Sequence, residues 1–407
     1  MLKNSLQSIE RLQDNPLGFY LEALATSFVQ DGYGDEAVRL KLALLADFGR
    51  WFGRTGLTIT HVDEQLVETF VKNRKQVRRG DRKTLQQFLD HLRKCSVIPD
   101  REPARETSPL ADILGRYEKH LHSERGLNTT TILNYRPFVR KFLVERFREG
   151  PFSFDEVIAS DISDFVLRHG HRMAATSAQL MTAALRSFFR FLFQRGDLGA
   201  DLAASVPTVA RWRLSTVPKY LSPEEVDRLL RTCHRRTASS RRDYAILLLL
   251  ARLGLRAGEV VALQLDDINW RAGEIIVRGK GLFRDRMPLL PDVGEALTSY
   301  LRNDRPVCQT RRVFVCMQAP RRGLAGSSTL TTIVRRALAR ANLHPKFKGA
   351  HLLRHSLATS MLRSGATMAE VGEVLRHRSA STTEIYAKVD FEGLRSLAHP
   401  WPMGGGK

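Results

Sequence analysis

The chain has 407 residues, too many for one ordinary hydrophobic core, so we expect two or three domains. Hydrophobic residues make up 43% of it, and the longest apolar run, Ala245 to Ala251, is much too short to span a membrane. Lys and Arg outnumber Asp and Glu by 64 to 43, which predicts a nucleoid-associated protein. The four cysteines form no C-x-x-C pair, so we expect a cytoplasmic protein without a disulfide scaffold or a cysteine zinc site.

Two polar stretches that contain proline divide the chain, SVIPDREPARETS at 96–108 and SVPTVARWRLSTVPKYLS at 205–222. Both are typical of linkers and predict domains at 1–100, 105–205 and 215–407. The first two segments have the apolar spacing of packed helices, with Phe48 and Phe142 at core positions. Segment 1–100 is nearly neutral but contains the basic run KNRKQVRRGDRK at 72–83, so it is either an extra DNA-binding module or a surface for accessory proteins.

The middle segment ends with a strongly apolar helix between Ser177 and Phe193. Its large side chains lie on more than one face, which indicates a core helix and not a cofactor site. The predicted core residues of this helix are Leu185, Phe188, Phe189, Phe191, Leu192 and Phe193.

The third segment begins with a capping box, in which Ser222 precedes Pro223 and Glu225 follows at the third helical position. A buried helix, DYAILLLLARLG, ends at Gly254, and GEIIVRGKGLFRDRMPLL predicts a β-hairpin with Ile275 and Val277 on one face. Further helices are expected at about 330–342, 351–364, 367–376 and 380–388. The predicted fold class is therefore mainly α with a small β-sheet.

This third segment also holds most of the positive charge. Residues 211–407 contain 34 basic and 17 acidic residues, and residues 305–369 contain twelve Lys or Arg and no Asp or Glu. Such a concentration of positive charge predicts a polyanionic partner, most simply nucleic acid. A merely solubilising surface is the weaker interpretation, because such surfaces normally mix both signs of charge.

Five short patterns follow one another in this basic segment: Gly254-Leu255-Arg256-Ala257-Gly258-Glu259, Gly279-Lys280-Gly281, His351-Leu352-Leu353-Arg354-His355, Leu375-Arg376-His377-Arg378-Ser379, and Tyr386 in TTEIYAKVD. In order and spacing they resemble the signature of the tyrosine recombinases, the family of phage integrases and chromosome-dimer resolvases. The resemblance covers the third segment and, more weakly, the middle one, as a helical core-binding domain. It implies an α+β catalytic domain and the catalytic residues Arg256, Lys280, His351, Arg354, His377 and the nucleophile Tyr386.

The resemblance implies cutting and rejoining of double-stranded DNA through a covalent 3′-phosphotyrosyl intermediate, with no metal and no nucleotide cofactor. Two arginines would bind the phosphate oxygens bidentately, and Lys280 would protonate the leaving 5′ oxygen. His351 would accept the tyrosine proton or orient the phosphate, and His377 would donate a hydrogen bond to it. Glu259 would orient neighbouring cationic groups without itself contacting the phosphate. Four protomers would assemble on two DNA sites, with the tail at 389–399 docking on a neighbouring subunit.

One residue departs from the family pattern, because Arg376 stands where the family usually has Gly before the second His. Glycine permits a positive φ and close approach, so the backbone around His377 is in question. We predict that the added guanidinium contacts a DNA phosphate. The other predicted phosphate contacts are Arg284, Arg286, Lys346 and Lys348, which also compete with Lys280 for its role.

Other interpretations stay open at this level. His351 and His355 have the spacing of a zinc pair, but position 352 is Leu where a metalloprotease needs Glu, so we expect His355 to be a packed, hydrogen-bonded structural residue. A type IB-like topoisomerase uses similar residue types, and a DNA-binding protein with a decayed site is the third possibility. The target DNA sequence, and whether the outcome is integration, excision, resolution or transposition, do not follow from the sequence.

Overall fold

The structure is a computed structural model that describes residues 17–100, 108–148, 152–210, 218–279, 284–389 and 395. The chain forms two compact units, one made of Met1–Pro99 with Thr216–Lys407 and the other of Asp100–Ser215. Among the described residues most elements are helices and the strands form one three-stranded sheet, which confirms the predicted fold class. Within these ranges no helix has both the length and the apolar character that crossing a bilayer requires.

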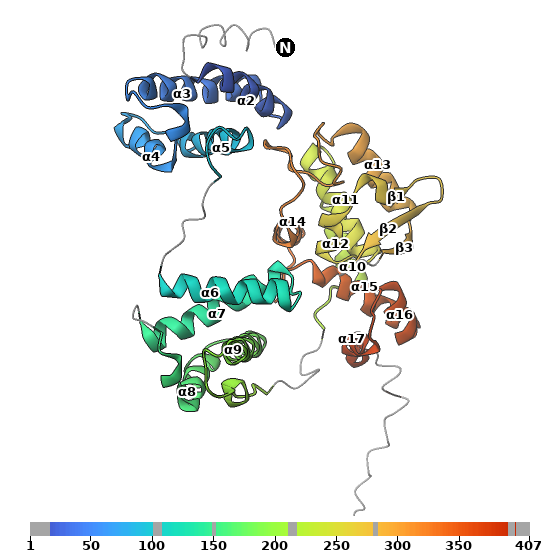
Figure 1. The fold of residues 1–407 in the computed structure, drawn as a ribbon. Helices are drawn as coiled ribbons and strands as arrows, with labels where there is room; N and C mark the ends of the chain where they lie inside the picture. The colour runs from blue at the N-terminus through green and yellow to red at the C-terminus, as the bar shows by residue number, and fades with distance from the viewer. Residues whose placement is uncertain are drawn as a thin grey trace, which may run out of the picture. The chain divides into compact units, whose positions relative to one another are not determined.

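Residues 17–98 form a small helical core (Figure 1). Its elements are α2 (Gly18–Gln30), α3 (Asp35–Gly53), η1 (Ile59–His61), α4 (Glu64–Asn73) and α5 (Asp81–Lys94). Phe48 of α3 is fully buried, and its ring lies edge-on to Phe70 of α4 and Phe88 of α5, with centroid distances of 5.1 and 6.1 Å. The apolar spacing around Phe48 therefore predicted the core correctly.

The second unit is also helical. It contains α6 (Pro109–Lys119), a short π-helix η2 (His120–Glu124), α7 (Thr129–Phe147), η3 (Phe154–Glu156), α8 (Ala159–Gly170), α9 (Ala175–Arg195) and η4 (Leu202–Ser205). On α9, Phe188 and Phe189 are fully buried as predicted, whereas Phe193 is 44% exposed. Phe193 lies in the last turn of the helix, which ends at Gly196 in the left-handed conformation, so fewer side chains cover it.

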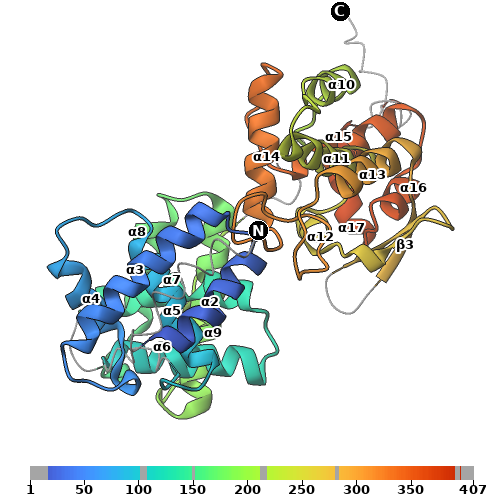
Figure 2. The same ribbon diagram turned by 90° about the horizontal axis from the view of Figure 1, so that it is seen from above.

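The remainder of the first unit contains the predicted catalytic segment (Figure 2). Its helices are α10 (Pro223–Arg231), α11 (Ala238–Arg252), α12 (Ala257–Ala262), α13 (Pro291–Asn303), α14 (Ser327–Arg340), α15 (His351–Arg363), α16 (Met368–Val374) and α17 (Ala380–Thr383). The predicted capping box is present, since the Glu225 amide donates to the Ser222 hydroxyl and the Ser222 amide donates to the Glu225 carboxylate. The buried helix α11 packs against α13 and α15.

The hairpin strands β2 (Glu274–Arg278) and β3 (Arg284–Pro288) pair antiparallel, with Ile275 opposite Met287. Ile275 and Val277 are both buried, which confirms that they share the inner face. A third strand, β1 (Ile268–Asn269), and the 3-10 turn η5 (Leu265–Asp267) were not predicted. The expected helix at 380–388 is instead α17 followed by the 3-10 helix η6 (Glu384–Val389).

Candidate active site

Arg256 lies at the N-terminus of α12, directly after the turn at Gly254. Glu259, one helical turn further on, accepts a hydrogen bond from the Arg256 amide at 2.8 Å and another from its Nη1 at 2.7 Å. The Arg256 side chain remains 39% exposed, whereas that of Glu259 is only 6% exposed. The carboxylate therefore orients a guanidinium that still has access to a ligand.

Burial alone would raise the pKa of Glu259. The hydrogen bond from the Arg256 backbone and the charges of Arg376 and Arg256 outweigh that effect, and the pKa lies below its ordinary value. Glu259 is therefore ionised at neutral pH, as an anion among arginines.

Arg354 lies in the first turn of α15 and is 3% exposed. Its Nη1 donates to the Gly254 carbonyl and its Nη2 to the Leu375 carbonyl, so it joins the turn before α12 to the end of α16. Burial lowers its pKa to about 10, with further lowering by the charges of Arg256 and Arg376. It remains a cation at neutral pH, close enough to Arg256 for the two charges to interact.

His377 follows α16, and its Nδ1 lies 2.8 Å from the hydroxyl of Thr383, which is buried on α17. Burial lowers the pKa of His377 to about 4, with further lowering by Arg354 and Arg256. The imidazole is thus neutral, and Thr383 fixes its orientation. Its ring is parallel to that of Tyr386, at a centroid distance of 6.4 Å.

Tyr386 lies in η6 and is 1% exposed. Its phenolic oxygen is 2.8 Å from Nδ1 of His355, the residue that directly follows Arg354 on α15. Burial raises the pKa of Tyr386 to about 12, although the positive charges of Arg354 and Arg256 act in the opposite direction. The tyrosine is therefore a neutral phenol under the influence of both arginines.

The pKa of His355 is lowered to about 4, first by burial and then by the charges of His351 and Arg354. A neutral imidazole offers one unprotonated nitrogen, which suits it as the acceptor of the Tyr386 proton. His351, four residues earlier on α15, also has a lowered pKa, caused first by burial and then by Arg354. The two imidazole rings are 6.4 Å apart, and no cluster of potential metal ligands is found in the part of the chain that the structure describes.

The structure thus brings five of the six predicted catalytic residues into one region, and the sixth, Lys280, falls outside the described residues, as does most of the tail at 389–399. Arg284, Arg286, Lys346 and Lys348 are all exposed. The side chain of Arg376, in contrast, is 8% exposed and its Nη2 lies 2.7 Å from Glu259. The guanidinium of Arg376 thus lies beside the carboxylate that orients Arg256.

Sequence reasoning missed the contacts of His355 and Thr383. His355 was expected to be a packed, hydrogen-bonded structural residue, but its partner, the phenolic oxygen of the predicted nucleophile, was not predicted. Thr383 was not singled out at all. The signal for His355 was present in its position four residues after His351, which places both on one helix face.

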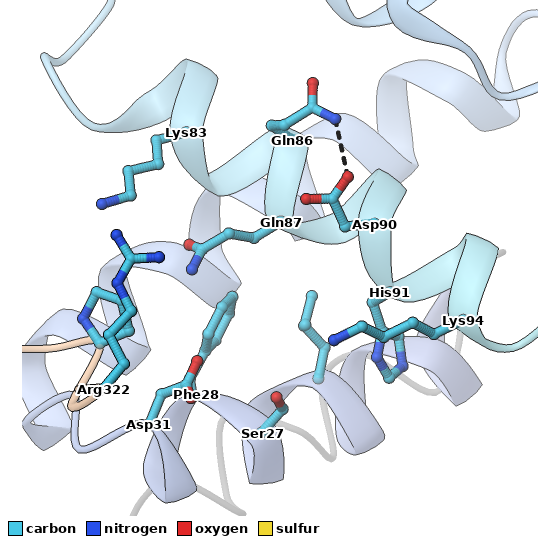
Figure 3. Close-up of a pocket in the computed structure, with 12 residues that line it drawn as sticks. Ser27, Phe28, Asp31, Lys83, Gln86, Gln87, Asp90, His91, Lys94 and Arg322 are labelled. Carbon is cyan, nitrogen blue, oxygen red and sulfur yellow. Dashed lines mark hydrogen bonds between the residues drawn. The ribbon is translucent and has the colours of Figure 1, made fainter. Parts of the chain in front are cut away.

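A separate hollow of about 470 Å³ lies between α2 and α5 and the segment at 320–322 (Figure 3). Ser27, Phe28 and Asp31 line one wall, and Gln86 and Asp90, which are joined by a 3.0 Å hydrogen bond, line the other. The lining mixes carboxylates with lysine and arginine side chains and includes none of the predicted catalytic residues. It is not the candidate active site.

Comparisons with known proteins identify the family of the chain. The model of the phage integrase family matches residues 219–392, and that of the phage integrase N-terminal SAM-like domain matches residues 114–196. A Sinorhizobium fredii protein named as an integrase/recombinase, y4rA, is 43% identical over 397 residues, covering 97% of each chain. The tyrosine recombinase XerC of Shewanella amazonensis is 32% identical over 303 residues, covering 71% of this chain and 96% of its own.

Two solved structures show the same fold. The XerH site-specific recombinase bound to its palindromic difH substrate has a TM-score of 0.57 at 19% identity, over 87% of this chain and 94% of its own. A lambda integrase dimer bound to a COC′ core site has a TM-score of 0.52 at 20% identity, over 68% of this chain and 94% of its own.

Proposed function

Because the chain belongs to the phage integrase family of tyrosine recombinases, we propose that it cuts and rejoins double-stranded DNA at a defined site, with Tyr386 as the nucleophile. The observation that best supports this role is the convergence of Tyr386, His355 and the Arg256–Arg354 pair. The matched relatives are named as recombinases, so the topoisomerase alternative is not retained.

In the proposed cleavage step the Tyr386 oxygen attacks a backbone phosphorus, and the bond from phosphorus to the 5′ oxygen breaks. A tyrosyl 3′-phosphodiester forms, and the 5′ oxygen leaves as a hydroxyl after gaining a proton. The phosphodiester count is unchanged, so attack by a 5′ hydroxyl reverses the step without ATP. Lys280 is our proposed donor of the proton to the leaving oxygen, from the family resemblance.

Arg256 and Arg354 are proposed to bind the non-bridging oxygens, where negative charge increases in the transition state. Guanidinium groups suit this task because their planar array of donors matches two phosphate oxygens at once. Both are already oriented before any ligand arrives, Arg256 by Glu259 and Arg354 by two carbonyls. Such preorganisation lowers the barrier more than groups that must reorient during reaction.

His355 is proposed to receive the proton of Tyr386 as the phenolic oxygen attacks. Its Nδ1 is within hydrogen-bond distance of that oxygen, and the neutral imidazole has one unprotonated nitrogen. Since Tyr386 is buried, the phenol must also become accessible to the phosphate, which requires a shift of η6 or of the residues that cover it. His351 and His377 are proposed to bind or orient the phosphate.

The other domain roles are also proposals. We infer that 105–205 and 215–407 clamp the DNA, that four protomers act on two sites with the C-terminal tail exchanged, and that 1–100 contacts DNA or accessory proteins. The family models leave 1–113 unmatched. Deleting 1–100 and measuring the DNA footprint distinguishes these two roles, because a DNA-binding module shortens the footprint when it is lost.

The direct test is incubation with a random-sequence duplex library followed by denaturation. The wild-type protein should remain covalently attached to a defined subset of sequences, and Tyr386→Phe should form no adduct. Tyr244→Phe is the matched control, because Tyr244 is partly buried in the core of the same unit. An adduct that persists in Tyr386→Phe would remove Tyr386 from the reaction.

A further inference from the structure

The backbone at Arg376 adopts a conformation that favours glycine. Its φ is +54°, in the left-handed region, at the position directly before His377. The Arg376 amide donates to the Glu373 carbonyl and the His377 amide to the Gly372 carbonyl, both at 2.8 Å, which ends α16 in a tight turn. A residue with a side chain is disfavoured in this conformation, and glycine is the usual solution at such helix ends.

The Arg376 side chain is buried, and its Nη1 lies 3.4 Å from the Val374 carbonyl, next to three further groups. Its Nη2 lies 2.7 Å from Oε2 of Glu259, its Nη1 contacts the sulfur of Met287 on β3, and its Nε lies 3.9 Å from the Asp285 carboxylate without a hydrogen-bond partner in the structure. Its side chain is 8% exposed and that of Glu259 6%. The contacts of this guanidinium are thus within the protein, and the strongest of them is with Glu259.

Glu259 joins Arg376 to Arg256. One carboxylate oxygen, Oε1, accepts from Nη1 of Arg256, and the other, Oε2, accepts from the Arg256 amide and from Nη2 of Arg376. The carbonyl of Arg376 also lies 3.5 Å from Nη2 of Arg256. Arg376 is thus connected to Arg256 in two ways. Its side chain binds the Glu259 carboxylate, which binds Arg256, and its own carbonyl lies next to the Arg256 guanidinium.

We propose that Arg376 is a positioning residue for DNA cleavage, which holds Glu259 in place and thereby fixes the guanidinium of Arg256. This inference rests on the proposed function. A purely stabilising role is a poor explanation, because buried ion pairs add little net stability and the left-handed backbone opposes the side chain. The contacts of Arg376 lead instead to Arg256, which is the exposed member of the Arg256–Arg354 pair.

The test compares Arg376→Met, Arg376→Lys and Arg376→Gly, alone and with Glu259→Gln. The probe is the duplex recovered from the wild-type adduct, rebuilt with a nick that makes cleavage irreversible. Single-turnover measurements give the rate constant of adduct formation at saturating protein and, separately, the protein concentration for half-saturation. Arg311→Met is the matched control, since it removes an exposed arginine that pairs with Asp266.

We expect Arg376→Met and Arg376→Gly to lower the rate constant by about 10- to 100-fold, with half-saturation changed less than about twofold, as for a misplaced catalytic group. Arg376→Lys should recover part of the rate, and Arg376→Met should have little further effect in the Glu259→Gln background. Equal rates in Arg376→Met, Arg376→Gly and wild type would overturn the proposal. So would a loss confined to half-saturation, which would indicate a direct DNA contact.

A second measurement needs no DNA. Phenylglyoxal modifies arginine, and mass spectrometry reports the rate at Arg256 in each variant. We expect faster modification of Arg256 in Arg376→Met and Arg376→Lys than in wild type, with no change in Arg311→Met; an unchanged rate would overturn the proposal. Because this readout is independent of adduct formation, a failure of the recombinase function, seen as a wild-type protein without adduct, is distinguishable from a failure of this inference.

Discussion

The Nδ1 atom of His355 lies 2.8 Å from the phenolic oxygen of Tyr386, across 31 residues of sequence. The contact joins the first turns of α15 to η6 and pairs a neutral imidazole with a neutral phenol. It is the closest contact of the proposed nucleophile with a group able to take its proton among the described residues.

Replacing His355 by Gln should slow adduct formation by about 100-fold, because the amide accepts a hydrogen bond but takes no proton from the phenol. His355→Phe should be at least as slow. The rate constant is measured in single-turnover cleavage of the nicked probe. His344→Gln, which changes an exposed histidine bound to Asn342, is the control and should retain the wild-type rate. Wild-type rates in both His355 variants would exclude it from the proton transfer.

His355 also predicts a pH dependence of stability. Burial, together with the charges of His351 and Arg354, lowers its pKa to about 4, while an unfolded histidine titrates near about 6.5. Between these values the unfolded chain binds more protons, so the free energy of unfolding rises with pH, by up to about 1.4 kcal/mol per pH unit for this one group. Urea unfolding from pH 4 to 7 should show a shallower rise in His355→Gln. An identical rise in both proteins would contradict the assigned burial of a neutral imidazole.

Gly254→Ala should destabilise the protein by about 1–3 kcal/mol. Gly254 has φ +57°, and a Cβ there would lie 2.7 Å from Leu375 Cδ2 and 3.0 Å from Leu357 Cδ2. Its carbonyl accepts from Arg354, so adduct formation should fall as well. Gly258→Ala, in α12 with nothing within 4 Å, is the matched control and should be neutral or stabilising by up to about 1 kcal/mol. Thermal or urea unfolding checks both.

Thr383→Val should reduce the cleavage rate by about tenfold, because the buried methyl group cannot hold the His377 imidazole in its orientation. Thr382→Val alters the neighbouring exposed threonine and should leave the rate unchanged. If the two variants cleave equally fast, the orientation of His377 does not depend on Thr383.

Lys346→Ala and Lys348→Ala should weaken DNA binding without changing which sequence is bound. Both lysines are exposed and lie in the stretch that lacks acidic residues. Each lost phosphate contact should reduce the slope of log affinity against log salt by about 1, measured by fluorescence anisotropy at several salt concentrations. An unchanged slope would show that these lysines do not contact phosphate.

Local rules predicted much of the fold. The Ser222–Glu225 capping box and the inner face of the hairpin at Ile275 and Val277 depend on residues close in sequence, and both are confirmed. The partner of His355 could not be predicted, because helical spacing says which residues share a face but not which distant segment covers it. The contact of Arg376 with Glu259 was not predicted for the same reason, since Glu259 lies 117 residues away.

The carbonyls of Leu375 and Arg376 contact the two arginine side chains of the site. Every amino acid supplies a carbonyl, so substitution at these positions leaves both acceptors in place as long as the turn keeps its shape. These two acceptors therefore depend on the path of the backbone through the turn and not on which side chains it carries.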